Sequence, residues 1–595
     1  MLAESNPAMS PVGHPPSSPD PIKPVLLWPA IAFLAVYWMA HLIVPRLETF
    51  YFVGFLFNLA SSVLLAIFFT TWWWTNRRIP LRLRLYGFLL IVGGGMIVEP
   101  FCDESVGWWG LLMSGLPVVL TVWVLWMIVA KKTCPSWQWR GSVAVVALTL
   151  AYFTLLRVDG LDSNLRADTH WRWDPSAENL FLEEKSHSAN HTAATRAGEI
   201  VALRPGDWPE FRGPNRDGVV HGVTIATDWE TRPPELLWRH RVGPAWSSVI
   251  VVGGRLYTQE QRSEQEAVVC YDAETGEELW AHADAARFWE SVSGAGPRAT
   301  PTFAAGRIYA LGGTGILNCL DAATGKRQWA RDIAAEAGTR PPQWGYSGSP
   351  LVTDGLVIVF AGGDGDQNLL AFRADTGQPA WAARAGGSSY SSPQLTTLAG
   401  VPQCLILSDQ GITAVNPATG KVFWKGGTAM PGGPRSVQPH TVGPTQLLVG
   451  TYDGASVTLL DVSRDGDRWS AVPRWTSKDL KPEFPDFVLH RGHAYGFDVS
   501  MFCCIDLATG KRCWKGGRYG RGQVVQLANQ ELLLVMSESG EAVLLAADPN
   551  QHRELGRFRA LDGKTWNHPV IAHSRLYARN AEELACYDLA PAPAR

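Results

Sequence analysis

The chain has 595 residues, which is too long for a single hydrophobic core, so more than one domain is expected. Its formal net charge is −3, and no long run of Lys or Arg occurs in the C-terminal portion, so the basic surface needed for nucleic-acid binding is missing. Nine cysteines are scattered without the Cys/His spacing of a zinc site, and no metal cluster is expected.

Strongly apolar stretches dominate the N-terminal part of the chain, after residues 1–23, which are expected to form a disordered cytoplasmic segment. Most stretches are long enough to cross a bilayer core of about 30 Å as helices. The third is short and contains Gly93, Gly94 and Gly95, which makes it the weakest prediction. The sequence predicts an all-α transmembrane domain over 24–156 that contacts the lipid bilayer, with about five spans at 24–44, 50–74, 85–99, 108–130 and 141–156.

Charged loops predict the orientation of these spans, because Lys and Arg near span ends stay on the cytoplasmic side. The second loop contains four arginines and the fourth loop is also basic, whereas the third is acidic; the basic residues are Arg77, Arg78, Arg82, Arg84, Lys131, Lys132 and Arg140. Alternation places the N-terminus in the cytoplasm and everything after Leu156 outside. We therefore expect a multi-pass protein of a bacterial inner membrane with a periplasmic C-terminal domain.

A polar linker is predicted over 157–206, where no apolar period is sustained. Within it, Trp171-Arg172-Trp173 precedes several glutamates, and this pattern favours a short amphipathic helix on the membrane surface.

A repeated motif, Asp-x-x-Thr-Gly-x-x-x-Trp, begins beyond Asp207. It occurs at 272–280, 321–329 and 506–514, with variants that lack the Asp at 373–381 and 416–424. The repeats recur at about 45 residues, and degenerate copies are expected near Asp461, Asp548 and Asp588. A unit of this length holds four short strands, which is one propeller blade. The sequence therefore predicts an all-β, eight-bladed propeller over 207–595, with each Trp packed between neighbouring blades.

The last unit lacks a Thr-Gly turn and a Trp, so another segment must complete it. The stretch 236–240 contains Trp238 and resembles an outer strand. Pairing with the last blade would close the ring and remove both exposed sheet edges.

The repeat resembles the tryptophan-docking motif of PQQ-like propellers, which include quinoprotein alcohol and glucose dehydrogenases and the BamB lipoprotein. The resemblance covers roughly 207–588, and helices followed by a periplasmic propeller resemble the layout of membrane-bound PQQ glucose dehydrogenase. It implies an oxidoreductase that uses PQQ with calcium and reduces quinone. The chain departs from these enzymes: its Trp-Asp pair, Trp173-Asp174, lies in the linker, and the stretch 363–368 is compact. A non-catalytic scaffold that binds an envelope protein is the preferred hypothesis, and the dehydrogenase is the alternative.

A ring of aromatic, Arg and Ser residues is expected where loops before the innermost strands converge on the central channel. The series includes Trp246, Arg298, Trp344, Tyr390, Arg435, His490-Arg491, Arg521, Lys564 and Trp566. Guanidinium groups and a stacking Trp would suit a small anionic ligand such as PQQ. The candidate binding residues are Arg298, Trp344, Tyr390, Arg435, Arg521 and Trp566. The simpler interpretation is that each loop only closes its blade.

Three further features have two interpretations. Cys503 and Cys504 either form a strained vicinal disulfide or fill a buried strand as thiols. Asp364, Asp366 and Asn368 form the tightest set of oxygen ligands, which a hairpin turn also explains. His440, His490 and His568 are base candidates only if they face the channel beside an acid.

Overall fold

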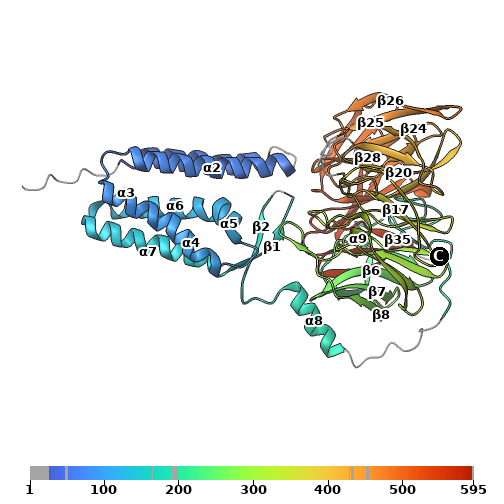
Figure 1. Cartoon of the computed structure of the whole chain (residues 1–595), viewed down its shortest axis with the longest axis horizontal. Coiled ribbons are helices and arrows are strands. Elements are labelled where there is room, and N and C mark those ends of the chain that lie inside the picture. The colour runs from blue at the N-terminus through green and yellow to red at the C-terminus, as the bar shows by residue number, and fades with distance from the viewer. Residues whose placement is uncertain are drawn as a thin grey trace, which may run out of the picture. The chain divides into compact units, whose positions relative to one another are not determined.

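The computed structural model describes residues 26–46, 51–163, 165–188, 199–427, 429, 435–450 and 455–591 (Figure 1). The chain forms two compact units. The helical unit comprises Met1–Ile43 and Phe57–Leu156, and the propeller unit comprises Val44–Leu56 and Arg157–Arg595.

Five helical segments make up the N-terminal part. They are α1 (Trp28–Ile43) with η1 (Val44–Arg46); α2 (Tyr51–Thr75); α3 (Leu81–Phe88) continued by η2 (Leu89–Gly93), α4 (Gly94–Val98) and η3 (Glu99–Phe101); α5 (Gly107–Gly110) continued by η4 (Leu111–Gly115), α6 (Leu116–Val129) and η5 (Ala130–Lys132); and α7 (Pro135–Thr154).

Three of these segments are long and apolar enough to cross a membrane: Val53–Thr75, Leu81–Phe101 and Gly107–Val129. The third predicted span, expected to be the weakest, therefore belongs to a helix of 21 residues. Its glycines do not break the helix, because a π-helical turn over Leu89–Gly93 absorbs the irregularity. The first helix is shorter, with 16 residues over Trp28–Ile43.

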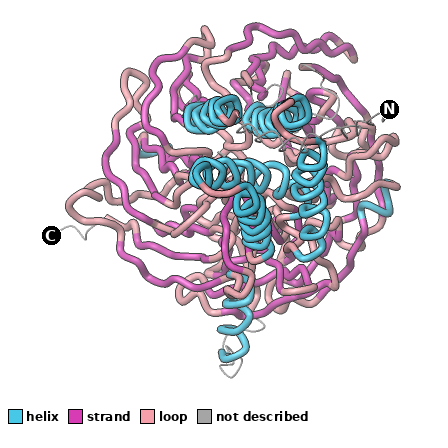
Figure 2. Tube along the Cα trace, turned by 90° about the vertical axis from the view of Figure 1, so that its left-hand side faces the viewer, coloured by secondary structure: helices cyan, strands magenta, loops and turns pink. Residues whose placement is uncertain are grey.

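Eight antiparallel sheets confirm the predicted propeller, and Figure 2 shows the strands disposed around a common centre. Blade 1 consists of β5 (Ile250–Val252), β6 (Arg255–Arg262), β7 (Gln265–Asp272) and β8 (Glu278–Asp284), and blade 2 of β11 (Thr302–Ala304), β12 (Arg307–Leu311), β13 (Ile316–Asp321) and β14 (Arg327–Asp332). Blade 3 consists of β15 (Leu351–Thr353), β16 (Leu356–Phe360), β17 (Leu369–Arg373) and β18 (Pro379–Ala383), and blade 4 of β19 (Gln394–Leu398), β20 (Val401–Ser408), β21 (Gly411–Val415) and β22 (Val422–Gly426).

The remaining blades follow the same order from the inner strand outwards. Blade 5 consists of β23 (His440–Val442), β24 (Gln446–Gly450), β25 (Val457–Asp465) and β26 (Arg468–Ser477), and blade 6 of β27 (Val488–His490), β28 (His493–Asp498), β29 (Met501–Asp506) and β30 (Arg512–Arg518). Blade 7 consists of β31 (Gln523–Leu527), β32 (Leu532–Met536), β33 (Glu541–Ala546) and β34 (Glu554–Arg559), with η7 (Ala528–Gln530) after β31. Blade 8 consists of β35 (Val570–Ala572), β36 (Arg575–Arg579), β37 (Glu583–Asp588) and β4 (Glu235–Arg241). A short strand, β3 (Val219–Val220), adds to blade 7 by parallel pairing with β31.

The recurring Trp docks on the Thr-Gly turn of the next blade, as predicted. Trp280 Nε1 donates to the carbonyl of Ala322 at 3.2 Å, and Trp329 Nε1 donates to that of Ala374 at 3.0 Å. A Cβ on Gly377, whose φ is +69°, would lie 2.6 Å from the Trp329 ring. The motif needs glycine for both the left-handed turn and the close ring contact.

The degenerate unit near Asp461 forms blade 5. The unit contains two tryptophans, Trp469 and Trp475, and the second takes the docking role, because its Nε1 donates to the carbonyl of Leu507 at 3.1 Å. Blade 5 lacks a Thr-Gly turn, and Trp424 of blade 4 instead donates to Gln403 Oε1 at 2.7 Å.

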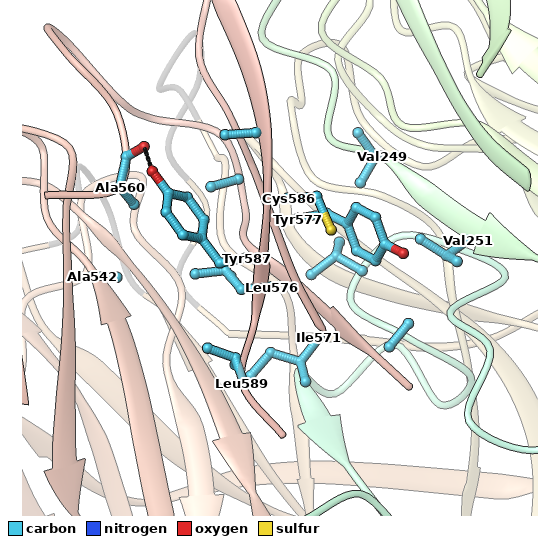
Figure 3. Packing of buried hydrophobic residues seen from close by; sticks show 14 of the residues in the cluster. Val249, Val251, Ala542, Ala560, Ile571, Leu576, Tyr577, Cys586, Tyr587 and Leu589 are labelled. Atoms are coloured by element: carbon cyan, nitrogen blue, oxygen red, sulfur yellow. Dashed lines mark hydrogen bonds between the residues drawn. The ribbon is translucent and has the colours of Figure 1, made fainter. Parts of the chain in front are cut away.

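The ring closes by the predicted strand exchange, because β4 pairs with β37 and places Trp238 opposite Cys586. Trp238 is buried, and its Nε1 donates to the carbonyl of Ala273 in blade 1 at 3.3 Å. Figure 3 shows the apolar packing of this last blade, including Tyr577 and the Tyr587 hydroxyl, which donates to a backbone carbonyl. Closure therefore joins residues about 350 positions apart in one sheet.

The polar linker contains β1 (Leu156–Leu161), β2 (Ala167–Trp171) and α8 (Ala177–Ser188). The predicted amphipathic helix exists, but its apolar side packs on blade 1. Phe181 is buried, with the guanidinium of Arg262 5.7 Å from its ring centroid, and Glu178 pairs with Arg287 at 3.0 Å. The propeller therefore covers Phe181, whereas Trp171 and Trp173, which carried the prediction of a membrane-surface helix, lie outside α8 and are exposed.

Cys503 and Cys504 are free thiols in β29, and both are fully buried. The Cys503 thiol donates to the carbonyl of Asp479 at 3.4 Å. Their role as buried strand residues is confirmed.

Candidate functional site

All six predicted binding residues lie in loops that lead into inner strands. Since the inner strands run in the same direction in successive blades, these loops meet at one end of the channel, which we call the channel mouth. The residues Arg298, Trp344, Tyr390, Arg435, Arg521 and Trp566 precede β11, β15, β19, β23, β31 and β35, respectively.

An aromatic cluster surrounds Trp566 at the mouth. Its ring centroid lies 5.0 Å from that of Trp246 and 5.4 Å from that of Phe484. The Lys564 ammonium lies 4.6 Å from the Trp566 ring centroid and 5.2 Å from that of Trp246. Trp566 Nε1 donates to Glu538 at 3.0 Å. Trp566 is half-buried, and these contacts engage its ring and its Nε1 within the protein.

A second cluster contains Arg298, Trp344 and Tyr390. The ring centroids of Trp344 and Tyr390 lie 5.2 Å apart. Burial raises the pKa of Tyr390, and the nearby charge of Arg298 opposes that shift. Arg298 pairs with Glu290 at 2.9 Å, and its guanidinium lies 4.5 Å from the centroid of Phe288. Burial lowers the pKa of Arg298, although the Glu290 carboxylate opposes that shift. The predicted cation is thus neutralised within the protein.

Arg435 and Arg521 are both buried. The carbonyl of Arg435 accepts a hydrogen bond from the Tyr390 amide at 2.7 Å, which joins the loops of blades 4 and 5. Arg521 forms an ion pair with Glu483. Glu483 and Phe484 belong to the loop that leads into β27. The repeat pattern predicts His490-Arg491 for this loop instead. That assignment is wrong: His490 ends β27, and Arg491 lies in the following turn with φ +45°.

The linker hairpin, defined here as residues 157–163 and 165–171, binds at the channel mouth. The Ser163 amide donates to Glu538 at 3.0 Å, and the Ser163 hydroxyl donates to the other oxygen of that carboxylate at 2.5 Å. Arg521 donates to the Ser163 carbonyl at 2.9 Å. Ser163 is only 3% exposed. The propeller therefore holds a segment of its own chain at the position expected for a ligand.

Two backbone contacts extend this attachment. Lys564 Nζ donates to the carbonyl of Leu161 at 3.0 Å, and the Leu161 amide donates to the carbonyl of Val292 at 2.8 Å. Val292 lies between β9 (Trp289–Glu290) and β10 (Gly294–Ala295), a small hairpin inserted before blade 2. A Cβ on Gly160, whose φ is +138°, would lie 2.9 Å from the Val292 oxygen, so the two hairpins approach closely. Burial lowers the pKa of Lys564, which is 3.0 Å from a carbonyl rather than free in water.

Sequence reasoning missed the acids of the mouth: Glu290, Glu483 and Glu538. Glu538 accepts four hydrogen bonds, two from Ser163, one from the Arg521 amide at 3.2 Å and one from Trp566. It lies in the turn between β32 and β33, outside the loops that the repeat pattern marks. Only the loop 482–487, which places two acids before an inner strand, could have been recognised from the sequence as a source of acids at the mouth.

Known sequences identify the repeat. The profile of the family described as outer membrane protein assembly factor BamB matches residues 264–516. BamB of Burkholderia pseudomallei is 26% identical over 289 residues, which cover 46% of this chain and 65% of that protein. The chain carries a PQQ-like β-propeller.

The quinohemoprotein alcohol dehydrogenase ADH-IIG of Pseudomonas putida is 30% identical over 158 residues, 24% of this chain and 21% of that enzyme. This chain thus spans less than two thirds of the length of either curated relative. Among solved structures, quinohemoprotein alcohol dehydrogenase ADHIIG of P. putida HK5 aligns with a TM-score of 0.48 at 14% identity, covering 67% of this chain and 85% of that one. BamB of Moraxella catarrhalis aligns with a TM-score of 0.44 at 16% identity, covering 60% and 99%.

Two cations at the mouth of this PQQ-like propeller are already paired with acids. A carboxylate-rich cofactor needs cations with free donors, whereas Arg298 and Arg521 pair with glutamates. Trp566 contacts Trp246 and Phe484, and the buried Ser163 bonds to Glu538 and Arg521.

The expected calcium ligands are also used otherwise. Asn368 Oδ1, the atom that would bind calcium, accepts from the Ala385 amide at 3.1 Å, and Asp366 lies 3.4 Å from Arg384. Asn368 Nδ2 donates to three carbonyls of its own turn, those of Gly362 at 3.2 Å, Gly363 at 2.7 Å and Gly365 at 3.1 Å. The hairpin-turn interpretation therefore accounts for this stretch.

The three candidate histidines differ in their surroundings. His440 lies 2.9 Å from Asp486, which also forms an ion pair with Arg212. Burial alone would raise the pKa of Asp486, but the charges of Arg212 and His440 hold it well below its usual range. His568 contacts the carbonyl of its neighbour, Pro569, at 2.9 Å. The contacts of Asp486 with His440 and Arg212 tie the segment before blade 1 to blades 5 and 6, which is a structural role.

Proposed function

We propose that this chain is a membrane-anchored PQQ-like propeller that binds a protein partner in the bacterial envelope, with the propeller on the periplasmic side of the inner membrane. The observation that carries the proposal lies at the channel mouth: the chain's own hairpin binds there, and Glu290 and Glu483 pair with Arg298 and Arg521, two of the cations that would hold an anionic cofactor. The similarity to BamB, named as an assembly factor, supports a role in protein interaction.

The end of the hairpin and the turn that follows it, residues 171–173, offer a surface for such a partner. Trp171 and Trp173 are stacked, with ring centroids 5.2 Å apart and an interplanar angle of 4°. Their exposed fractions are 39% and 65%. Rigid aromatic side chains are enriched at protein interfaces because they bury a large area at low entropic cost. We therefore place the partner contact beside the hairpin rather than inside the channel.

Cofactor binding gives the first test. The full chain is purified in detergent, incubated with excess PQQ and Ca²⁺, and desalted, with a PQQ-dependent alcohol dehydrogenase as a positive control. We expect no retained cofactor absorbance and no dye reduction with sugars or alcohols. Stoichiometric retention with substrate-dependent dye reduction would establish the dehydrogenase instead.

Partner contact gives the second test. A photo-crosslinking amino acid is placed in cells at Trp173 and, as a control, at Val472, which is 55% exposed on the outer strand of blade 5. We expect one discrete protein adduct at Trp173 that is absent at Val472. Equal labelling at both positions, or adducts with lipid alone, would count against a partner at the hairpin.

A further inference from the structure

A cavity of about 510 Å³ lies along the channel wall, separate from the six residues of the mouth. One side is the lead-in segment, residues 207–220, and the other is formed by the inner strands β15, β19, β23 and β27. The lead-in segment is held in extended contact with neighbouring inner strands: Trp208 bridges Val251, the Phe303 amide donates to Pro209 at 2.8 Å, and β3 pairs with β31. The cavity is thus a fixed feature of the folded ring.

One buried acceptor in the cavity wall is unsatisfied. Gln394, the first residue of β19, is only 6% exposed, and its Oε1 has no hydrogen-bond partner among the described residues. A buried amide oxygen without a partner costs about 1–3 kcal/mol relative to one that is paired. A ligand that supplies a donor at this position would recover that cost.

The charges of the lining favour a donor that is also a cation. Arg216 directs its donors at protein acceptors: Glu210 at 3.1 Å, the Pro350 carbonyl at 3.0 Å and the Ser349 carbonyl at 3.0 Å. Within the described residues, the Asp217 carboxylate accepts one hydrogen bond, from the Val219 amide at 3.0 Å. The charges of Glu210 and Arg216 offset each other, so the Asp217 carboxylate gives the cavity lining a net negative charge.

Hydroxyl groups complete the polar wall. Thr396 of β19 and Thr441 of β23 lie with their oxygens 2.6 Å apart, so one hydroxyl donates to the other. Both threonines line the cavity. Together with Gln394 Oε1 and the Asp217 carboxylate, their hydroxyl oxygens give the lining several acceptors, and Asp217 gives it the negative charge that selects a cationic donor.

We propose that this cavity binds a small ligand carrying a primary ammonium group, with Gln394 Oε1 and the Asp217 carboxylate as its acceptors. The ammonium group supplies three donors and the positive charge that the lining lacks. A free polyamine and the side chain of a lysine-containing peptide present the same group, and the cavity volume accommodates either. The site is independent of the channel mouth and of the function proposed for it.

Calorimetric titration of the full chain in detergent tests the site with trilysine, spermidine, Nε-acetylated trilysine and maltotriose as probes. We expect trilysine to bind saturably and the acetylated peptide to bind at least tenfold more weakly. Spermidine binding tighter than trilysine would indicate a polyamine as the source of the ammonium group, and the reverse a peptide. Maltotriose binding without trilysine binding would overturn the proposal.

Two variants locate the binding. Gln394→Leu and Asp217→Asn should each weaken trilysine at least fivefold, and Gln394→Leu should unfold at the same or a higher temperature because it removes an unsatisfied polar group. The matched control is Gln403→Leu in the same blade. Gln403 is also buried but fully bonded, donating to the Leu398 carbonyl at 3.2 Å and accepting from Trp424 at 2.7 Å. This control should lower the melting temperature and leave affinity unchanged. Unchanged affinity in both site variants would refute the assignment.

Discussion

Replacing Glu538 by Ala should release the linker hairpin from the channel mouth. The carboxylate accepts two hydrogen bonds from Ser163 and one each from the Arg521 amide and Trp566 Nε1. A hydrogen bond to a charged group contributes about 1.5–3 kcal/mol. Losing the two that involve Ser163 should therefore weaken hairpin attachment by at least about 3 kcal/mol.

Hydrogen exchange measured by mass spectrometry reads this change directly. Since about 1.4 kcal/mol corresponds to a factor of ten, amides in the peptide spanning 156–163 should exchange about a hundredfold faster in Glu538→Ala. Amides of β16 and β20, in blades 3 and 4, should keep their protection. The global melting temperature should fall less, because the blades close without the hairpin.

The control variant is Glu541→Ala, three residues further along. Its carboxylate is 30% exposed and lies 3.5 Å from Arg557, so the substitution removes only a surface ion pair worth at most about 1 kcal/mol. Hairpin exchange should be unchanged in this control. Unchanged exchange in Glu538→Ala itself would refute the reasoning, and with it the idea that the mouth is held shut by this carboxylate.

Three further predictions concern the propeller. Trp238→Ala should lower the free energy of unfolding by about 3–5 kcal/mol, because a buried indole at the ring closure is lost, whereas Trp173→Ala should cost under about 0.5 kcal/mol; denaturant titration compares them, and equal effects would contradict the closure. Gly377→Ala should cost at least about 1 kcal/mol more than Gly400→Ala, since both have positive φ but only the first meets a Trp ring; equal melting temperatures would count against the docking contact. Burial lowers the pKa of His568 to about 3, so below about pH 6.5 the unfolded state gains a proton that the folded state rejects; His568 should cost about 2 kcal/mol of stability between pH 7 and pH 5, and a gap to His568→Gln that stays constant with pH would disprove this.

The sequence determined the repeat architecture. Each Asp-x-x-Thr-Gly-x-x-x-Trp motif is local, because the turn, its glycine and the docking Trp all act within one unit and its neighbour. Counting units therefore predicts eight blades, and the incomplete last unit points to Trp238 as the missing strand, which the pairing of Trp238 with Cys586 confirms. Apolar length predicts the membrane helices in the same way, because lipid imposes a local requirement on each span.

Only the tertiary structure decided what happens inside the ring. The sequence marked Arg298 and Arg521 as cations, but their partners, Glu290 and Glu483, come from loops that no repeat pattern aligns with them. Ser163 reaches Glu538 across 375 positions in the chain, a pairing that depends on how the ring closes and not on any local preference. A residue type predicts which chemistry it can perform, whereas its partners are fixed by packing, and at this channel mouth the partners neutralise the charges that the sequence seemed to offer to a ligand.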